Sequence, residues 1–282
     1  MIQDSIKITY GKWEAQINPR LGANIISLKE DGKDILRPLE DEAALQINPY
    51  LYGAPILAPA NRTYLGKFTF EGVEYTLPIN EAKNNCNLHG SVLYQPFEVL
   101  SSDESSVKLM LTDKECGCYP FPFSLTVSYK LCEEGCVSEF EFKNEGDGNM
   151  PLTFALHTTF VEPESFTLPV NEKQERDNHC IPTGRYIPLS EQEEGYVVGS
   201  PSRGLRVDGY FHSAGKVAKV GDYTYTVSEN FDHWVLFNGG GVRGFLCLEP
   251  QAGRSNGLNY ADGHMVVAPK ESAFFRTVIS KD

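Results

Sequence analysis

Hydrophobic and polar residues alternate along much of this chain with the period of two that is typical of a half-buried β-strand. The clearest example contains Phe123, Leu125, Val127, Tyr129 and Leu131, which are separated by single polar residues. A helix with one buried face would instead repeat its apolar positions about every 3.6 residues. The pattern therefore predicts a β-strand over this stretch.

Shorter runs of apolar and β-branched residues recur through the chain, and turn residues separate them. We expect strands at residues 12–18, 25–29, 68–70, 73–77, 97–100, 107–111, 123–131, 140–142, 151–160, 224–228, 234–237, 244–248, 265–268 and 273–279. The pairs Asp31-Gly32 and Glu71-Gly72 are two-residue turn signals, which predict hairpins. We also expect three consecutive antiparallel strands within residues 123–160, because neighbouring strands commonly pair.

Two stretches lack this alternation. Residues 40–46 predict a short helical turn. Residues 162–202 are rich in Glu, Pro, Gly and Asn, and we expect long connecting loops there, with a short strand at Tyr196-Val197-Val198. We expect no helix of twelve or more residues. The predicted fold is all-β, with two large antiparallel sheets packed face to face in one domain.

The chain of 282 residues carries a formal net charge of −13. Nucleic acids and anionic membranes require a basic surface, so we expect neither as a partner. The first residues lack the basic and apolar regions of a secretory signal, and no apolar run approaches the length of a membrane span. We therefore expect a cytoplasmic protein that is a monomer or a homodimer.

Seven cysteines are present, and an odd number in a long chain does not indicate a disulfide framework. The close pairs Cys116/Cys118 and Cys132/Cys136 have no second pair or histidine at zinc-finger spacing. We therefore expect no metal and no cofactor.

Three histidines and one glutamate are candidates for chemistry. His89 precedes a glycine, His157 lies near the end of an apolar strand, and His233 follows an aspartate. Taken alone, a histidine of this kind is more often structural than catalytic. Glu249 ends an apolar run, and we expect Pro250 to terminate the strand there. A carboxylate in this position is either paired or used chemically, because burying it unpaired is costly.

A salt bridge to Arg243 or Arg254 is the structural alternative for Glu249. Arg62 follows Asn61 in a turn, and its planar fork of donors suits sugar hydroxyls. A surface ion pair would explain Arg62 equally well. Composition and spacing by themselves leave these choices open.

The residue pattern resembles that of the aldose 1-epimerase (galactose mutarotase) family over nearly the whole chain. The likeness is carried by Asn61-Arg62, Gly66-Lys67-Phe68, Gly72-x-x-Tyr75-x-Leu77, Asn80, Leu88-His89-Gly90, Tyr119-Pro120 to Leu131, His157, Phe231-Asp232-His233 and Leu248-Glu249-Pro250-Gln251. This resemblance implies a single aldose 1-epimerase-like domain over residues 1–282, folded as a galactose mutarotase-like β-supersandwich.

The resemblance also implies a reaction, the interconversion of the α and β anomers of a free aldose such as galactose or glucose, with no cofactor or metal. Glu249 looks like the general base and His157 like the general acid. A cation and a carboxylate facing one site favour each other's charged forms, so we expect protonated His157, ionised Glu249 and a bell-shaped pH–rate profile. Substrate-binding roles are implied for Asn61, Arg62, His89, Asp232 and Gln251.

Three alternatives remain at this stage. A hexose-6-phosphate mutarotase would need extra cations near the sugar's C6, for which Arg176, Arg185 and Arg203 are candidates. A non-catalytic sugar-binding protein would not need a matched acid and base. A β-sandwich interaction module is the least specific alternative, because a fold alone implies no function.

Overall fold

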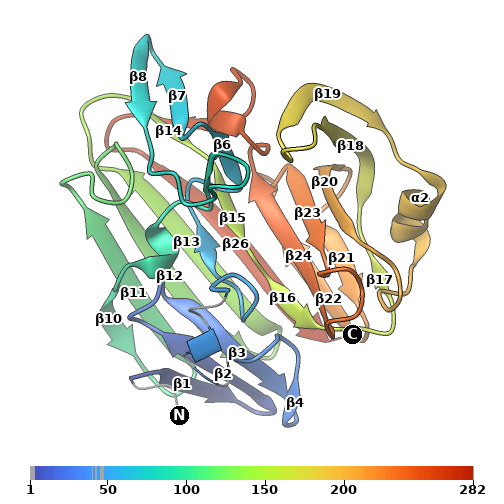
Figure 1. Cartoon of the computed structure of the whole chain (residues 1–282). Helices are drawn as coiled ribbons and strands as arrows, with labels where there is room; N and C mark the ends of the chain where they lie inside the picture. The colour runs from blue at the N-terminus through green and yellow to red at the C-terminus, as the bar shows by residue number, and fades with distance from the viewer. Residues whose placement is uncertain (1–3, 40, 42, 45–47, 282) are drawn as a thin grey trace.

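The computed structural model describes the chain except for residues 1–3, 40, 42, 45–47 and 282. Two eight-stranded antiparallel sheets dominate it (Figure 1). Sheet I has the order β10 (Glu98–Ser102), β11 (Ser106–Asp113), β12 (Phe123–Cys132), β13 (Gly135–Asn144), β26 (Ser272–Lys281), β22 (Tyr223–Val227), β21 (Val217–Val220), β17 (Phe166–Thr167). Sheet II has the order β19 (Pro182–Pro188), β18 (Val170–Arg176), β20 (Asp208–Ser213), β23 (His233–Phe237), β24 (Phe245–Ala252), β15 (Phe154–Leu156), β5 (Ile56–Leu57), and β16 (Thr159–Val161) also pairs with β24.

Smaller sheets surround these two. One has the order β1 (Ile6–Tyr10), β2 (Trp13–Asn18), β3 (Asn24–Glu30), β4 (Lys33–Asp34). The others are two-stranded: β6 (Arg62–Tyr64) with β9 (Cys86–Leu88), β7 (Lys67–Phe70) with β8 (Val73–Thr76), and β14 (Met150–Leu152) with β25 (Met265–Val267). The helices are short: α2 (Glu191–Val198), η1 (Val92–Tyr94) and η2 (Gly257–Asn259). Within the described ranges, no helix is long and apolar enough to cross a membrane.

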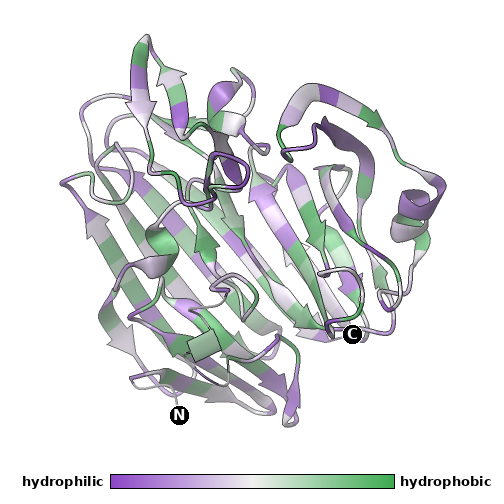
Figure 2. Cartoon of the chain, viewed as in Figure 1, coloured by the Kyte–Doolittle hydropathy of each residue, from purple (hydrophilic) through white to green (hydrophobic). Residues whose placement is uncertain are grey.

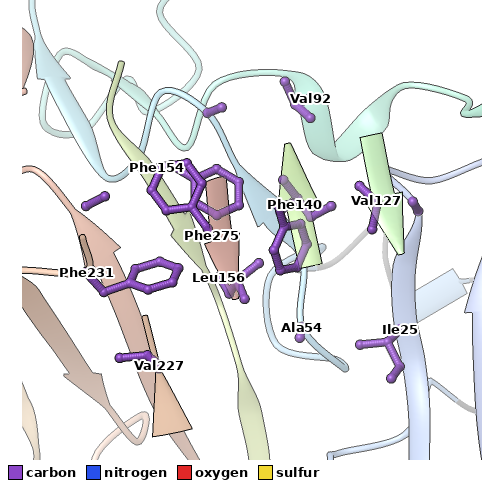
Figure 3. Packing of buried hydrophobic residues seen from close by; sticks show 14 of the residues in the cluster. Ile25, Ala54, Val92, Val127, Phe140, Phe154, Leu156, Val227, Phe231 and Phe275 are labelled. Carbon is purple, nitrogen blue, oxygen red and sulfur yellow. The ribbon is translucent and has the colours of Figure 1, made fainter. Parts of the chain in front are cut away.

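The core lies between sheet I and sheet II (Figure 3). Phe154 of β15 stacks on Phe275 of β26 with ring centroids 4.4 Å apart, and its ring lies 5.3 Å from that of Phe140 on β13. All three side chains are buried. Strands of both sheets thus turn one face inward, and the alternation of hydrophobic and hydrophilic residues along them is visible in Figure 2.

The sequence pattern predicted most of this architecture. The five alternating apolar residues of β12 are all buried, as a strand with one inward face requires. Asp31 and Gly32 both have positive φ (52° and 76°), as do Glu71 and Gly72 (48° and 81°), which is the backbone that two-residue hairpins favour. The all-β class and the large antiparallel sheets are therefore confirmed.

The expectation of three consecutive strands within residues 123–160 was wrong. β12 and β13 do pair, but the other edge of β13 pairs with β26 near the end of the chain, over eight residue pairs. The chain instead crosses to sheet II, where β15 pairs with β24 and β5. Strand β26, which lies far along the sequence, thus occupies the position beside β13 where the next strand of the chain was expected.

The expectation of long loops over residues 162–202 was also wrong. β18 and β19 form an antiparallel hairpin at the edge of sheet II. Tyr196-Val197-Val198 ends helix α2 and is not a strand. The carboxylate of Glu193 accepts hydrogen bonds from the backbone N–H (2.8 Å) and the hydroxyl (2.6 Å) of Ser190, which is the start signal of a helix. The helical turn predicted at residues 40–46 lies partly outside the described residues.

Candidate functional site

A cavity of about 320 Å³ opens on one face of sheet II. A row of cross-strand partners forms its floor: Tyr210 on β20, Val235 on β23 and Glu249 on β24. The segment around β6 and β9 contributes Asn61, Arg62, Glu81, Leu88 and His89, and the other lining residues are Asn48, Tyr50, Leu51, His157, Arg176, Cys180, Asp208 and Phe237. The cavity therefore joins several segments that are far apart in the sequence.

A gap in the strand pairing along one edge of β24 determines where His157 and Glu249 lie. The first residues of β24 pair with β16 and its last residues pair with β15, and His157 lies between those two partner strands. Glu249 and Pro250 lie opposite this gap. Proline has no N–H to donate, so a gap in the ladder tolerates it. Pro250 does not end the strand, contrary to expectation, because β24 continues to Ala252.

His157 and Glu249 face each other across the gap. His157 Nε2 lies 3.3 Å from Glu249 Oε1, and the two side chains are only 7% and 3% exposed. The ring of Tyr50 stacks beside that of His157 at 6.0 Å, and the ring of His89 meets it edge-on at 5.4 Å. These rings contribute to the burial of the pair.

Burial governs the protonation of this pair. It lowers the pKa of His157 to about 4. It also raises the pKa of Glu249 well above its usual range, with a further rise from Asp208 and an opposing effect of Arg62. Burial therefore favours a neutral imidazole and a protonated carboxyl. This contradicts the charged forms expected from the sequence, because desolvation outweighs the attraction between opposite charges.

Arg62 is fixed in the cavity wall by a bidentate ion pair. Its Nε and Nη2 donate to Glu81 Oε2 and Oε1 at 2.7 and 2.6 Å, and its Nη1 donates to the Tyr210 hydroxyl at 2.5 Å. Asn61 Oδ1 accepts from the Ser255 hydroxyl (2.7 Å) and from the Arg62 N–H (2.9 Å). Asn61 thus holds the turn that presents Arg62, and no sequence signal had indicated Glu81.

His89 lines the same cavity from the end of β9. Its backbone N–H donates to the carbonyl of Asn61 at 2.8 Å, so the two ends of this stretch are joined. Its side chain is buried, and burial, together with His157 and Arg62, lowers its pKa well below the usual range. His89 is therefore a neutral hydrogen-bonding group in the cavity.

Asp208 and Arg176 also line the cavity, and Asp208 was not identified from the sequence. Arg176 Nη1 lies 2.8 Å from Asp208 Oδ1, and its guanidinium lies 4.8 Å from the centre of the Tyr210 ring. Arg185 and Arg203 are exposed and pair with Glu175 and Glu162. Of the three arginines considered from the sequence, only Arg176 faces the cavity.

Asp232 and Gln251 do not line the cavity, contrary to expectation. Asp232 Oδ1 accepts hydrogen bonds from the Gly253 N–H and from Nδ1 of His233, both at 2.8 Å. Gln251 donates to the carbonyl of Gly253 at 2.9 Å. Both side chains therefore stabilise the turn at Gly253, just beyond Glu249 in the chain. The aspartate that lines the cavity is Asp208.

The salt bridges proposed for Glu249 are absent from the described residues: Arg254 pairs with Asp262, and no ion pair joins Arg243 to Glu249. One group of donors in the described chain has the spacing of a metal site, since donor atoms of His157, Cys247 and Glu249 lie within 4.8 Å of one another. Burial raises the pKa of the Cys247 thiol well above its usual range. Metal ligands must be deprotonated, so these residues fit a metal poorly.

Known structures share this fold. A galactose mutarotase-like protein from Clostridium acetobutylicum superposes with a TM-score of 0.91 at 22% identity, covering 99% of this chain and 95% of that one. A galactose 1-epimerase from Lactobacillus acidophilus NCFM gives a TM-score of 0.80 at 15% identity, covering 99% and 94%. The fold is that of the galactose mutarotase-like β-proteins.

The sequence comparisons give the family. The sequence profile of the aldose 1-epimerase family matches residues 4–280, so the chain belongs to this family. It is 27% identical over 218 residues to the Escherichia coli (strain K12) protein YihR, covering 74% of this chain and 69% of YihR. It is 28% identical over 193 residues to Rattus norvegicus galactose mutarotase, covering 62% of this chain and 54% of the rat protein. The match thus spans about half the length of the rat relative. Family membership supports a mutarotase-type isomerase function.

Proposed function

We propose that this protein is an aldose 1-epimerase that interconverts the α and β anomers of an aldose such as galactose or glucose. The observation that carries the proposal is the contact between His157 Nε2 and Glu249 Oε1, 3.3 Å apart at the cavity floor. Two titratable groups at this distance supply the acid and the base that ring opening requires.

The chemistry needs two proton transfers and no net change in protonation. A base removes the proton of the C1 hydroxyl, an acid delivers a proton to the ring oxygen O5, and the C1–O5 bond breaks. The aldehyde then rotates about C1–C2, and O5 attacks its other face while the two protons return. An acid and a base that share one proton complete this cycle without an outside proton donor.

We assign the base to Glu249 and the acid to His157. Before a sugar binds, burial favours the shared proton on Glu249. When a sugar enters, its hydroxyls and the Arg62 guanidinium stabilise the carboxylate, and the proton moves to His157 Nε2. Glu249 then takes the C1 proton, and His157 donates to O5.

The remaining polar groups bind and orient the sugar. Arg62 is held by Glu81 and Tyr210, so its remaining N–H groups are preorganised to donate to a ring oxygen or hydroxyl. Neutral His89 and the carboxylate of Asp208 are the proposed partners of ring hydroxyls. Asp208 replaces Asp232 in this role, because Asp208 lines the cavity.

The test is the acceleration of anomer interconversion. Pure α-anomers of glucose, galactose and several pentoses are dissolved, and optical rotation or anomeric NMR signals are followed with and without the protein. We expect acceleration of at least one sugar, and a loss of about 10²- to 10⁴-fold in His157→Asn and Glu249→Gln. No acceleration of any free or anionic aldose would contradict the proposal and favour a binding protein.

A further inference from the structure

A second cavity of about 320 Å³ adjoins the sugar cavity on the same face of sheet II. Asp208 and Phe237 line both cavities, so the two lie side by side. The other residues of the second cavity are Arg206, Val207, Gly239, Gly240 and Arg243. The second cavity is therefore an extension of the first, with two arginines at its wall.

The strand register sets the direction of this extension. Tyr210, Val235 and Glu249 form one cross-strand row, and Asp208 and Phe237 belong to the next row on the same face. Two residues along a strand span about 7 Å. A pyranose whose C1 hydroxyl meets Glu249 can therefore direct its far end towards Asp208 and the second cavity.

Both arginines of the second cavity are exposed, so an anion in solution can reach them. Arg206 Nη2 lies 4.0 Å from Asp208 Oδ2, and its side chain is 83% exposed. The other oxygen of Asp208 is held by Arg176 at 2.8 Å. In the part of the chain that the structure describes, no carboxylate lies within ion-pairing distance of Arg243.

The loop beside Arg243 is shaped around its side chain. Gly239 has φ of +63°, and a Cβ at this position would lie 2.8 Å from Cδ of Arg243. A side chain at position 239 would therefore displace the arginine stem. Arg243 is one of the residues that line the second cavity.

The net charge of the residues that line the two adjoining cavities is opposite to that of the chain. Arg62, Arg176, Arg206 and Arg243 face Glu81, Asp208 and the buried Glu249. The whole chain carries −13. A positive region in an acidic protein concentrates an anionic substrate at the site.

We propose that the substrate of the sugar site carries an anionic group, a phosphate ester or a carboxylate, at the end remote from C1, and that Arg206 and Arg243 bind this group. The inference rests on the proposed function, since it names the substrate class of the same site. Arginine suits both anions because its planar fork donates two parallel hydrogen bonds.

The first experiment compares kcat/KM for anomerisation of glucose, glucose 6-phosphate and glucuronate, measured by NMR exchange of the anomeric signals. We expect kcat/KM to be at least tenfold higher for one of the anionic sugars than for glucose. The comparison of glucose 6-phosphate with glucuronate identifies whether the anionic group is a phosphate or a carboxylate. Arg206→Gln/Arg243→Gln should lose about tenfold on the anionic sugar and leave glucose unchanged. Arg20→Gln removes an exposed arginine that pairs with Asp4, and serves as the control.

Equal effects of the double substitution on glucose and on the anionic sugars would overturn the subsite while leaving the epimerase function in place. Calorimetric titration with glucose 6-phosphate and with inorganic phosphate tests the subsite without catalysis. Binding that is lost in the double variant and retained in Arg20→Gln supports it, even if no sugar is anomerised and the proposed function fails. Binding that persists in the double variant overturns it.

Discussion

Glu249 and His157 lie on opposite sides of a gap in one ladder, and burial moves their pKa values in opposite directions. An ionised Glu249 in this position costs folding free energy, because no side chain compensates its lost hydration fully. Destabilising groups of this kind are expected at sites of catalysis.

Replacing Glu249 with glutamine should therefore stabilise the protein at alkaline pH. The folded-state pKa of Glu249 is raised, so its favourable contribution is complete below the unfolded pKa and is lost as pH rises towards the folded pKa. We expect Glu249→Gln to increase the free energy of unfolding by about 1 kcal/mol at pH 8, with the difference shrinking towards pH 4. Urea unfolding at both pH values measures this. A variant that is less stable at both would mean that the carboxylate is ionised and stabilised in the folded state.

Tyr50 should control the protonation of His157. Its ring packs on the imidazole, while His89, Glu249 and Arg62 are the other titratable or charged groups nearby. Removing the ring in Tyr50→Ala admits water, so the pKa of His157 should rise from about 4 towards 6.5. The acid limb of the pH–rate profile should shift upward accordingly. Tyr50→Phe keeps the ring and should leave the limb in place, and the same shift in both variants would exclude shielding as the cause.

At the scale of elements, local signals predicted the hairpins and the long strands correctly. β12 was predicted by the strict alternation of its apolar and polar residues. The two hairpin turns were predicted by the dipeptides Asp31-Gly32 and Glu71-Gly72. The sequence did not reveal that β24 continues through Pro250, because the gap between β15 and β16 that accommodates it is a property of the partner strands. The Ser190/Glu193 helix start was present in the sequence and was overlooked.

The junction of β6 and β9 is set by a close backbone approach. Gly90 has φ of +63°, and a Cβ at this position would overlap the carbonyl oxygen of Ala58. Gly72 has φ of +81°, but a Cβ there would meet no atom within 4 Å. Gly72→Ala should therefore cost about 1 kcal/mol of unfolding free energy from backbone strain alone, and Gly90→Ala about 3 kcal/mol, because the backbone must also move.

Denaturant unfolding of the two variants measures this difference. Since Arg62 and His89 flank the junction, Gly90→Ala should also weaken sugar binding, whereas Gly72→Ala should not. Equal destabilisation by the two substitutions would contradict the close approach.

At the scale of the whole molecule, the cavity joins segments that are up to roughly two hundred residues apart in the chain. Resemblance to a family identified His157, Glu249, Arg62, Asn61 and His89, all of which line it. It did not give Asp208 or Glu81, whose positions depend on the register of β20 and on the turn before β9. Long-range register of this kind is not encoded in any local pattern of residues.

The pH dependence of kcat/KM for anomerisation shows whether His157 and Glu249 act as one acid–base pair that shares a single proton. We expect activity to fall below about pH 4, where His157 gains a proton, and to fall again on the alkaline side, where the last proton leaves the pair. His157→Asn and Glu249→Gln should lack activity throughout this range. An acid limb at the ordinary histidine value of 6.5, or variants as active as the native protein, would mean that these two residues do not form such a pair.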